Sequence, residues 1–434
     1  MHKYSIALVC DHFHTTGGIE THLKYLCGSF RDLGHKVIVI TTSKVDIRYN
    51  NVKIYNLDRI EIINGISMPY FLKTGSVLKK IFEENEINIV HCHQSISTLS
   101  LEALFIAKCL NIRTCFSEHS IFSLKSFLSI FLSVIIKHVL RDVDVITSVS
   151  RSAANNLSKR INVDEKRIKI VTNAINYDIF NRKNIIIKKG KNKNTKIFDP
   201  KKIFNSKLEK IVKYEEGIKL YKESKLVYST SKIIICVVTR FEKRKGIILL
   251  IKVLKILFKK SDDFIVKIAG KGSQEFLIKD FISENNLKDK IFVFNDISHD
   301  NISDFYKSGH IFLNTSLTEA FCIAILEAYA SGLFVISTNV GGVKEILPFE
   351  KIYFSDVCEN NLVYLILNSK KKINEKSNLK SLKKKYSWKK VAKSYIRYYG
   401  RRNKKDQKKR PRNFLEIVLF VVLNTIEFIF KLKL

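Results

Sequence analysis

One stretch, residues 311–347, constrains the fold of this chain more than any other. It contains two short apolar runs, IFLN and LFVIS, which are typical of buried strands. Between them lies AFCIAILEAYA, which is rich in helix-forming residues and is followed by Ser331-Gly332, a suitable helix stop. A strand, a helix and a strand joined by short turns form a βαβ unit, and such a unit belongs to a parallel sheet.

Two carboxylates lie at defined places in this unit. Glu319 lies in the turn between strand and helix, and Glu327 lies inside the helix. Ligands of open α/β sheets bind outside the carboxyl ends of the strands, where helix amino termini favour phosphate or sugar oxygens. The pair could also be one acidic cap and one solvated side chain. An unpaired carboxylate is costly in the apolar run around Glu327, which favours a binding role.

The same alternation of strands and helices predicts two doubly wound, Rossmann-like α/β domains, at residues 1–181 and 232–400. In the first domain, Gly18 follows the first strand, so backbone N–H groups there could face a phosphate. His119 follows the strand IRTCFSE at the same sheet edge. It is either a hydrogen-bonded core residue or a residue of the site.

The second domain places two cations at a strand end. Arg240 and Lys245 lie in the turn after the run IIICVVT. A bidentate arginine and a point-charge lysine together suit a pyrophosphate. The alternative is a solvated basic turn, which is the expectation for Lys243 and Arg244. Groups from both domains would then meet in a cleft between them, where pockets are common.

The cysteines indicate the redox state of the compartment, and one pair of histidines raises the question of a metal site. The eight cysteines have no paired spacing, and Cys10, Cys236 and Cys322 lie in apolar runs, which predicts buried free thiols in a reducing compartment. His91 and His93 would share one face of a strand. No second ligand cluster with zinc spacing follows in the sequence, which favours a role without metal.

The charge points to an anionic partner. The net charge of +35 suggests nucleic acid, anionic lipid or a phosphorylated substrate. No aromatic-rich RNA-binding pattern or zinc finger is present in the sequence, so we do not expect nucleic-acid binding. Much of the excess lies in residues 182–231, a Lys/Asn-rich stretch that predicts a flexible insertion, and in the basic linker 401–412.

The carboxyl-terminal residues 413–434 are strongly apolar and predict a membrane-anchor helix. The run FLEIVLFVVLNTIEFIF within them is marginal in length and contains two Glu, so it spans a bilayer, lies in its interface or packs as a terminal core helix. By the positive-inside rule, the basic linker before it places the rest of the chain in the cytosol. We expect no secretory signal, because IALVC near the amino terminus is too short for one.

Several motifs together resemble a known family. TRFEKRKG, LNTSLTEAFCIAILEAYASG and STNVGG resemble the family 4 glycosyltransferases of the GT-B fold, and EAFCIAILE resembles their motif of two spaced Glu. DHFHTTGGIETHL, SEHSIFS and VGGVKEILP further resemble the members that transfer GlcNAc from UDP-GlcNAc to phosphatidylinositol, the first step of GPI-anchor biosynthesis. The resemblance covers nearly all of residues 4–181 and 232–400, together with the apolar tail.

The resemblance implies a role for each candidate residue of the second domain. Arg240 and Lys245 are expected to hold the donor diphosphate and stabilise the leaving UDP. Glu327 is expected to accept hydrogen bonds from the ribose. Glu319 is expected to face the donor sugar and stabilise the positive charge that develops at its anomeric carbon. A glycine turn at Gly270 is expected to belong to the same nucleotide-sugar site.

For the first domain, the resemblance implies that Gly18 lets its loop approach the diphosphate and that His119 contacts the sugar near the reacting centre. It also implies transfer with retention of configuration, without metal or cofactor. The turn that relatives write G-E-G-P is here GKGS, and their P-N-A-V-D is here TNAIN, so the roles of Lys271 and Asn176 stay open.

The implied setting is a multisubunit GlcNAc-transferase complex in the endoplasmic reticulum membrane, with the catalytic domains facing the cytosol. Two alternatives remain. One is another family 4 enzyme with a different sugar donor or a different lipid or glycan acceptor. The other is an inactive scaffold subunit of a membrane complex, against which the intact set of Arg240, Lys245, Glu319 and Glu327 argues.

Overall fold

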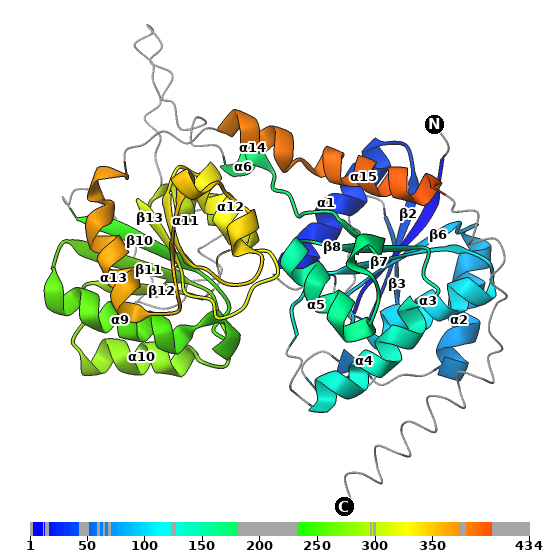
Figure 1. Cartoon of the computed structure of the whole chain (residues 1–434), viewed down its shortest axis with the longest axis horizontal. Helices are drawn as coiled ribbons and strands as arrows, with labels where there is room; N and C mark the ends of the chain where they lie inside the picture. The colour runs from blue at the N-terminus through cyan, green and yellow to red at the C-terminus, as the bar shows by residue number, and fades with distance from the viewer. Residues whose placement is uncertain are drawn as a thin grey trace, which may run out of the picture.

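Two α/β domains lie side by side in the computed structural model (Figure 1). The structure describes residues 3–11, 13, 17–42, 52–58, 61–63, 66–67, 71–122, 127–180, 232–295, 297, 301–373 and 379–401. The predicted insertion and the predicted terminal helix lie outside these residues. Within them, no helix combines the length and the apolar character needed to cross a bilayer.

The first domain is built on a parallel sheet with the strand order β3-β2-β1-β6-β7-β8-β9. Its strands are β1 Ser5–Val9, β2 Lys36–Thr41, β3 Lys53–Asn56, β6 Ile89–His93, β7 Arg113–Glu118, β8 Val145–Ser148 and β9 Ile168–Ile170. Both faces are buried, because alternate residues of β1 enter two different clusters. Ile6 and Leu8 belong to one apolar cluster, and Ala7 and Val9 belong to the other.

Helices connect these strands. They are α1 Gly18–Asp32, α2 Phe71–Glu84, α3 Thr98–Cys109, α4 Phe127–Leu140, α5 Arg151–Ile161, α6 Tyr177–Phe180 and the short η1 Glu165–Arg167, with a small hairpin formed by β4 Glu61–Ile63 and β5 Ile66–Ser67. Helix α1 is amphipathic, and Leu23, Leu26, Cys27 and Phe30 form its buried stripe at helical spacing. Ile136 and Leu140 of α4 are buried in the core of the domain.

The second domain repeats the plan with the strand order β12-β11-β10-β13-β14-β15. Its strands are β10 Ile233–Val238, β11 Phe264–Ala269, β12 Ile291–Phe294, β13 Ile311–Asn314, β14 Phe334–Thr338 and β15 Ile352–Ser355. All are parallel, and Ile311 and Phe312 of β13 pair with Phe334 and Val335 of β14. The βαβ unit predicted from residues 311–347 is therefore confirmed.

The helices of the second half are α9 Ile247–Lys260, α10 Glu275–Glu284, α11 Ile302–Lys307, α12 Ile323–Ala330, α13 Glu359–Leu367, α14 Leu379–Lys385 and α15 Trp388–Gly400. Short 3-10 turns lie among them, namely η3 Lys243–Lys245, η4 Val343–Glu345, η5 Phe349–Lys351 and η6 Asn368–Lys371. Helix α12 begins at Ile323 rather than at Ala320, where the composition predicts it. The Glu319 carbonyl accepts a hydrogen bond from the Gly342 N–H, at 2.9 Å, instead of starting the helix.

The strand order locates the expected place for a ligand in each domain. In both sheets the order reverses next to the first strand, between β1 and β6 in one domain and between β10 and β13 in the other. Such switch points leave a crevice outside the carboxyl ends of the strands, where α/β proteins bind ligands. The turns after β10 and β13 carry Arg240, Lys245 and Glu319.

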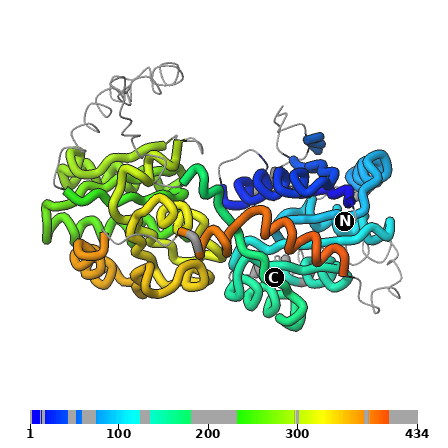
Figure 2. Tube along the Cα trace, turned by 90° about the horizontal axis from the view of Figure 1, so that it is seen from above, coloured from blue at the N-terminus to red at the C-terminus, as the bar shows by residue number. Residues whose placement is uncertain are grey.

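The last of the described helices, α15, crosses back onto the first domain and packs along α1 (Figures 1 and 2). The sequence predicts a closing helix there with Trp388 as an apolar anchor, and Trp388 is buried. The prediction assigned this helix to the second domain, but its buried side chains Tyr395 and Tyr399 lie against Phe30 of α1. The first domain is thus completed by the end of the described chain.

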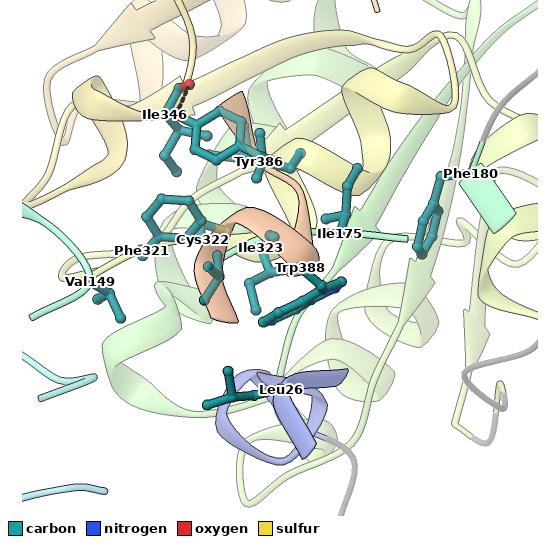
Figure 3. Packing of buried hydrophobic residues seen from close by; sticks show 14 of the residues in the cluster. Leu26, Val149, Ile175, Phe180, Phe321, Cys322, Ile323, Ile346, Tyr386 and Trp388 are labelled. Carbon is teal, nitrogen blue, oxygen red and sulfur yellow. Dashed lines mark hydrogen bonds between the residues drawn. The ribbon is translucent and has the colours of Figure 1, made fainter. Parts of the chain in front are cut away.

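A continuous apolar cluster joins the two domains (Figure 3). Leu26 of α1 and Val149 come from the first domain, and Phe321 and Ile323 come from the second. Trp388 lies between them. Because this core is shared, the edges of the two sheets are held against each other by apolar packing.

Candidate functional site

The carboxyl edges of the two sheets meet at the border of the domains. A Cβ added to Gly18, the first residue of α1, would lie 3.7 Å from Cδ1 of Ile323, the first residue of α12. A Cβ added to Gly342 would lie 2.6 Å from Oγ of Ser150. The start of α12 therefore lies against the start of α1, and the turn after β14 lies against Ser150, which precedes α5.

Lys245 and Glu319 form an ion pair at the switch point of the second sheet. Glu319 is 6% exposed, and its Oε1 also accepts a hydrogen bond from Ser316 Oγ at 3.1 Å. Opposite charges held together with little solvent between them interact strongly. The structure thus brings together two candidates that lie far apart in the sequence, and it adds Ser316, which sequence reasoning missed.

The turn that carries Lys245 depends on a glycine. Gly246 has a φ of +70°, and a Cβ there would lie 1.9 Å from the carbonyl oxygen of Thr315. The close approach lets Leu317 N–H donate to the Arg244 carbonyl at 2.9 Å. The turn after β10 and the turn after β13 are therefore locked together, which explains why Lys245 reaches Glu319.

Two arginines lie beside this pair. Arg240 is exposed at the end of β10, as expected for a ligand-binding cation. Arg244 is also on the surface, but partial burial and the neighbouring Arg240 lower its pKa, while Glu319 and Glu242 act in the opposite direction. Arg244 therefore interacts with the charges of the site, which the prediction of a solvated turn residue did not include. The run of cations in EKRKG was the available signal.

Glu327 is buried inside α12 and is paired with a tyrosine. Tyr306 Oη donates to Glu327 Oε2 at 3.0 Å, and the tyrosine is fully buried. Burial raises the pKa of Glu327 to about 7, and the hydrogen bond from Tyr306 partly offsets that effect. The carboxyl group is thus held in one orientation and changes charge near neutral pH.

The glycine turn at Gly270 has a packing role. Its φ is +151°, and a Cβ would lie 1.8 Å from the Thr239 carbonyl oxygen. Its N–H donates to the Phe294 carbonyl at 2.9 Å. The N–H of Gly270 is therefore used within the protein, and the glycine lets this turn pack under the segment that carries Arg240.

His119 belongs to a cluster of histidines at the edge of the first sheet. Its Nε2 lies 3.0 Å from His93 Nδ1, and its ring centroid lies 4.7 Å from that of His22. His22 Nδ1 in turn lies 2.8 Å from Asn173 Oδ1. Burial lowers the pKa of His22 to about 4 and lowers the pKa of His93 and His119 well below the usual value. Sequence reasoning missed His22 and Asn173, which only the fold brings next to His119.

Helix α15 reaches beneath this cluster. Tyr399 Oη lies 2.7 Å from His91 Nδ1, and His91 Nε2 lies 2.7 Å from Ser117 Oγ. Tyr395 Oη is 3.0 Å from the same Ser117 oxygen. The His91 ring lies 4.2 Å from that of His93, as expected for two residues on one face of a strand. Contacts from the last described helix therefore fix the base of the histidine cluster.

A carboxylate of the second domain caps a helix of the first. Glu345 accepts hydrogen bonds from the N–H groups of Arg151 and Ser152, at 2.8 and 2.9 Å, and from Ser152 Oγ at 2.8 Å. These two residues begin helix α5, where unpaired N–H groups and positive partial charge favour an anion. The carboxylate thus connects the domains at the edge of the site.

We expect Glu345→Ala to destabilise the protein by about 1–2 kcal/mol, as for the loss of a helix cap. The reason is that two N–H groups of α5 lose their partners. Thermal unfolding should show a melting temperature lowered by several degrees. The control is Glu350→Ala, because Glu350 is an exposed glutamate of the same domain. Equal melting temperatures for the two variants would show that the cap contributes nothing.

Comparison with known proteins agrees with this architecture. A model of family 4 glycosyltransferases matches residues 16–179, and a model of group 1 glycosyl transferases matches residues 219–352. A solved glycosyltransferase from Rickettsia africae ESF-5 is similar with a TM-score of 0.68 at 19% identity, covering 94% of this chain and 100% of that one. Anabaena Alr3699/HepE in complex with UDP-glucose is similar with a TM-score of 0.66 at 13% identity, covering 91% of this chain and 98% of that one. The chain belongs to the family 4 glycosyltransferases of the GT-B fold.

Relatives with assigned names indicate which glycosyltransferases this chain is similar to. The chain is 28% identical to an Arabidopsis thaliana protein named as one of the subunits of phosphatidylinositol N-acetylglucosaminyltransferase, over 92% of this chain and 82% of that one. The human protein of the same name is 28% identical over 92% of this chain and 76% of its own length. The Schizosaccharomyces pombe protein named as the gpi3 subunit of that enzyme is 29% identical over 89% and 78%.

Proposed function

We propose that this protein is the catalytic subunit that transfers GlcNAc from UDP-GlcNAc to phosphatidylinositol, the first step of GPI-anchor biosynthesis. Relatives that match about nine-tenths of the chain carry that enzyme's name. The observation that carries the catalytic role is the Lys245–Glu319 pair at the switch point of a GT-B second domain. A scaffold has no physical need for such a buried charge pair, whereas a leaving diphosphate requires preorganised positive charge.

In this proposal the donor lies against the second domain. Arg240, Arg244 and Lys245 neutralise the diphosphate, which removes the need for a metal ion there. Glu327 accepts hydrogen bonds from the ribose hydroxyls with the oxygen that Tyr306 leaves free. Gly18 is the first residue of α1, where N–H groups lack intrahelical partners and can face the diphosphate.

The proposed reaction breaks the bond between the anomeric carbon and the diphosphate oxygen, and the electron pair leaves with UDP. The inositol hydroxyl attacks from the same face and gives its proton to the departing phosphate oxygen, so configuration is retained. Glu319 stabilises the positive charge that develops at the anomeric carbon. His119 contacts the sugar at the edge of the first domain. We further propose a setting at the cytosolic face of the endoplasmic reticulum membrane, with the other subunits of the complex.

The function can be tested in membranes from a host depleted of its own catalytic subunit, carrying this protein with its partner subunits. Labelled UDP-GlcNAc and phosphatidylinositol should yield a GlcNAc-lipid, and membranes with Glu319→Gln serve as the background control. Labelling of a lipid by another nucleotide sugar and not by UDP-GlcNAc would overturn the donor assignment. Absence of transfer from every donor, with the complex shown to be assembled, would overturn the catalytic role.

The raised pKa of Glu327 predicts a pH dependence of donor binding. The ionised carboxylate is the better acceptor for the ribose hydroxyls, and its fraction rises as pH passes through about 7. The Kd of UDP-GlcNAc should therefore fall by up to about tenfold between pH 6 and pH 8. Calorimetry at both pH values measures the effect, and Glu327→Gln should abolish it. A Kd that does not change with pH in the wild-type protein would contradict this role of Glu327.

A further inference from the structure

We infer that His22, His93 and His119 form a transition-metal site of the zinc type, and that an ion bound there inhibits the proposed transferase. One nitrogen of each histidine lies within 4.8 Å of one nitrogen of the other two. The histidines come from α1, from the end of β6 and from the residue after β7. The inhibitory part of this inference rests on the proposed function, whereas the binding part does not.

The cluster contains buried nitrogen atoms that have no partner in the protein. His22 Nε2 and His93 Nε2 are inaccessible and unbonded, and both residues are 0% exposed. Polar atoms in such positions are usually satisfied, so His22 Nε2 points to a group that belongs there. The nitrogen of His93 that faces His119 is Nδ1, and its Nε2 points elsewhere. For His22 the chemistry is defined further. Asn173 Oδ1 can only accept a hydrogen bond, so His22 Nδ1 carries the proton and Nε2 presents a lone pair.

This pairing is the one expected around a metal. Histidines that bind metal usually donate their other ring N–H to a fixed oxygen, which sets the tautomer and the ring orientation. Asn173 supplies such an oxygen at 2.8 Å. The structure therefore provides a ligand and also the outer contact that orients it.

The spacing approaches that of ligands around a small ion, because the three ligand nitrogens lie within 4.8 Å of one another. With zinc–nitrogen distances of about 2.0–2.1 Å, two ligands of a tetrahedral ion lie about 3.4 Å apart. His93 Nδ1 and His119 Nε2 are 3.0 Å apart and share a hydrogen bond that an ion would replace. Three imidazoles without a thiolate or carboxylate suit Zn²⁺, Cu²⁺ or Ni²⁺ better than Mg²⁺ or Ca²⁺.

The site leaves one side open. His22 and His93 are fully buried, and the Trp388 ring lies 5.2 Å from that of His22, whereas His119 is partly exposed. A fourth ligand such as water would thus enter on the His119 side. An ion bound there coordinates the His119 ring, which contacts the sugar in the proposed mechanism. Metal binding and productive binding of the donor therefore compete.

The test uses the full-length protein in its complex, stripped of metal and then titrated with Zn²⁺, or with Co²⁺ as a spectroscopic probe. We expect one Zn²⁺ per chain and the visible absorption bands of a four-coordinate Co²⁺. His22→Gln should weaken binding at least 100-fold, and Asn173→Ala should weaken it about 10- to 100-fold while keeping all three ligands. His138→Gln is the control, because His138 lies on α4 outside the cluster.

Transfer activity is then measured against Zn²⁺ for each variant relative to its own metal-free rate. The wild-type protein and His138→Gln should be inhibited over the concentration range in which Zn²⁺ binds, and His22→Gln should not. Equal Zn²⁺ affinity in His22→Gln and His138→Gln would overturn the site and leave a hydrogen-bonded cluster around buried water. If His22→Gln loses Zn²⁺ binding but Zn²⁺ does not inhibit transfer by the wild-type protein, the inhibitory role is overturned. Absence of transfer by the metal-free wild-type complex would overturn the proposed function and leave the binding result intact.

Discussion

Glu319→Gln should lower kcat by about 1000-fold while the protein stays folded. The substitution keeps the size of the side chain and its hydrogen-bonding capacity toward Ser316, but it removes the negative charge. In the proposed reaction that charge stabilises a transition state with positive character at the anomeric carbon, and loss of one such group typically costs a factor of about 100 to 1000. Single-turnover transfer from labelled UDP-GlcNAc measures the loss.

The matched control is Glu350→Gln, which changes an exposed glutamate of the same domain in the same way. It should leave kcat and KM unchanged. If Glu319→Gln retained more than about a tenth of the wild-type kcat, Glu319 would not carry the electrostatic role assigned to it.

Lys245→Ala should lower kcat/KM by about 1000-fold and should weaken UDP binding, because its ammonium group offsets the charge of the diphosphate in the proposed mechanism. The alanine also leaves the carboxylate of Glu319, a buried group, without its partner. Lys245→Gln addresses that complication, since a glutamine can still donate a hydrogen bond to Glu319 but carries no charge. Both variants should fail in transfer, and Lys245→Gln should melt closer to the wild-type protein.

Lys243→Ala is the control for this pair, because Lys243 is an exposed cation of the same 3-10 turn. Its effect on UDP binding should be small and should disappear at high salt, as for other exposed charges. Equal losses from Lys243→Ala and Lys245→Ala would show that the turn acts only through its net charge, and would remove the specific role of Lys245.

Much of the second domain could be predicted from the sequence because its signals are local. The runs IFLN and LFVIS became strands close to where the pattern placed them, and the parallel order then follows from the short connections. Strand ends predict site residues in such a fold, and the Lys245–Glu319 ion pair agrees with that rule.

Other parts were not visible in the sequence for physical reasons. Strands β3 and β15 lie at the edges of their sheets, and each is only four residues long, which is too short for a clear period. The start of α12 depends on a hydrogen bond from the distant turn at Gly342. The contact between His22 and Asn173 links residues 151 positions apart, which no periodicity can reveal. Tertiary contacts set these features.

The return of α15 has a consequence for the order in which the protein is made. Domains generally fold as units during synthesis, beginning at the amino terminus. Here the first domain leaves the ribosome without the helix that packs along α1 and that supplies the tyrosine hydroxyl to His91. Until residue 400 has been synthesised, Phe30 and the base of the histidine cluster have no cover from α15. The packing of the first domain is therefore completed only after the second domain has been synthesised.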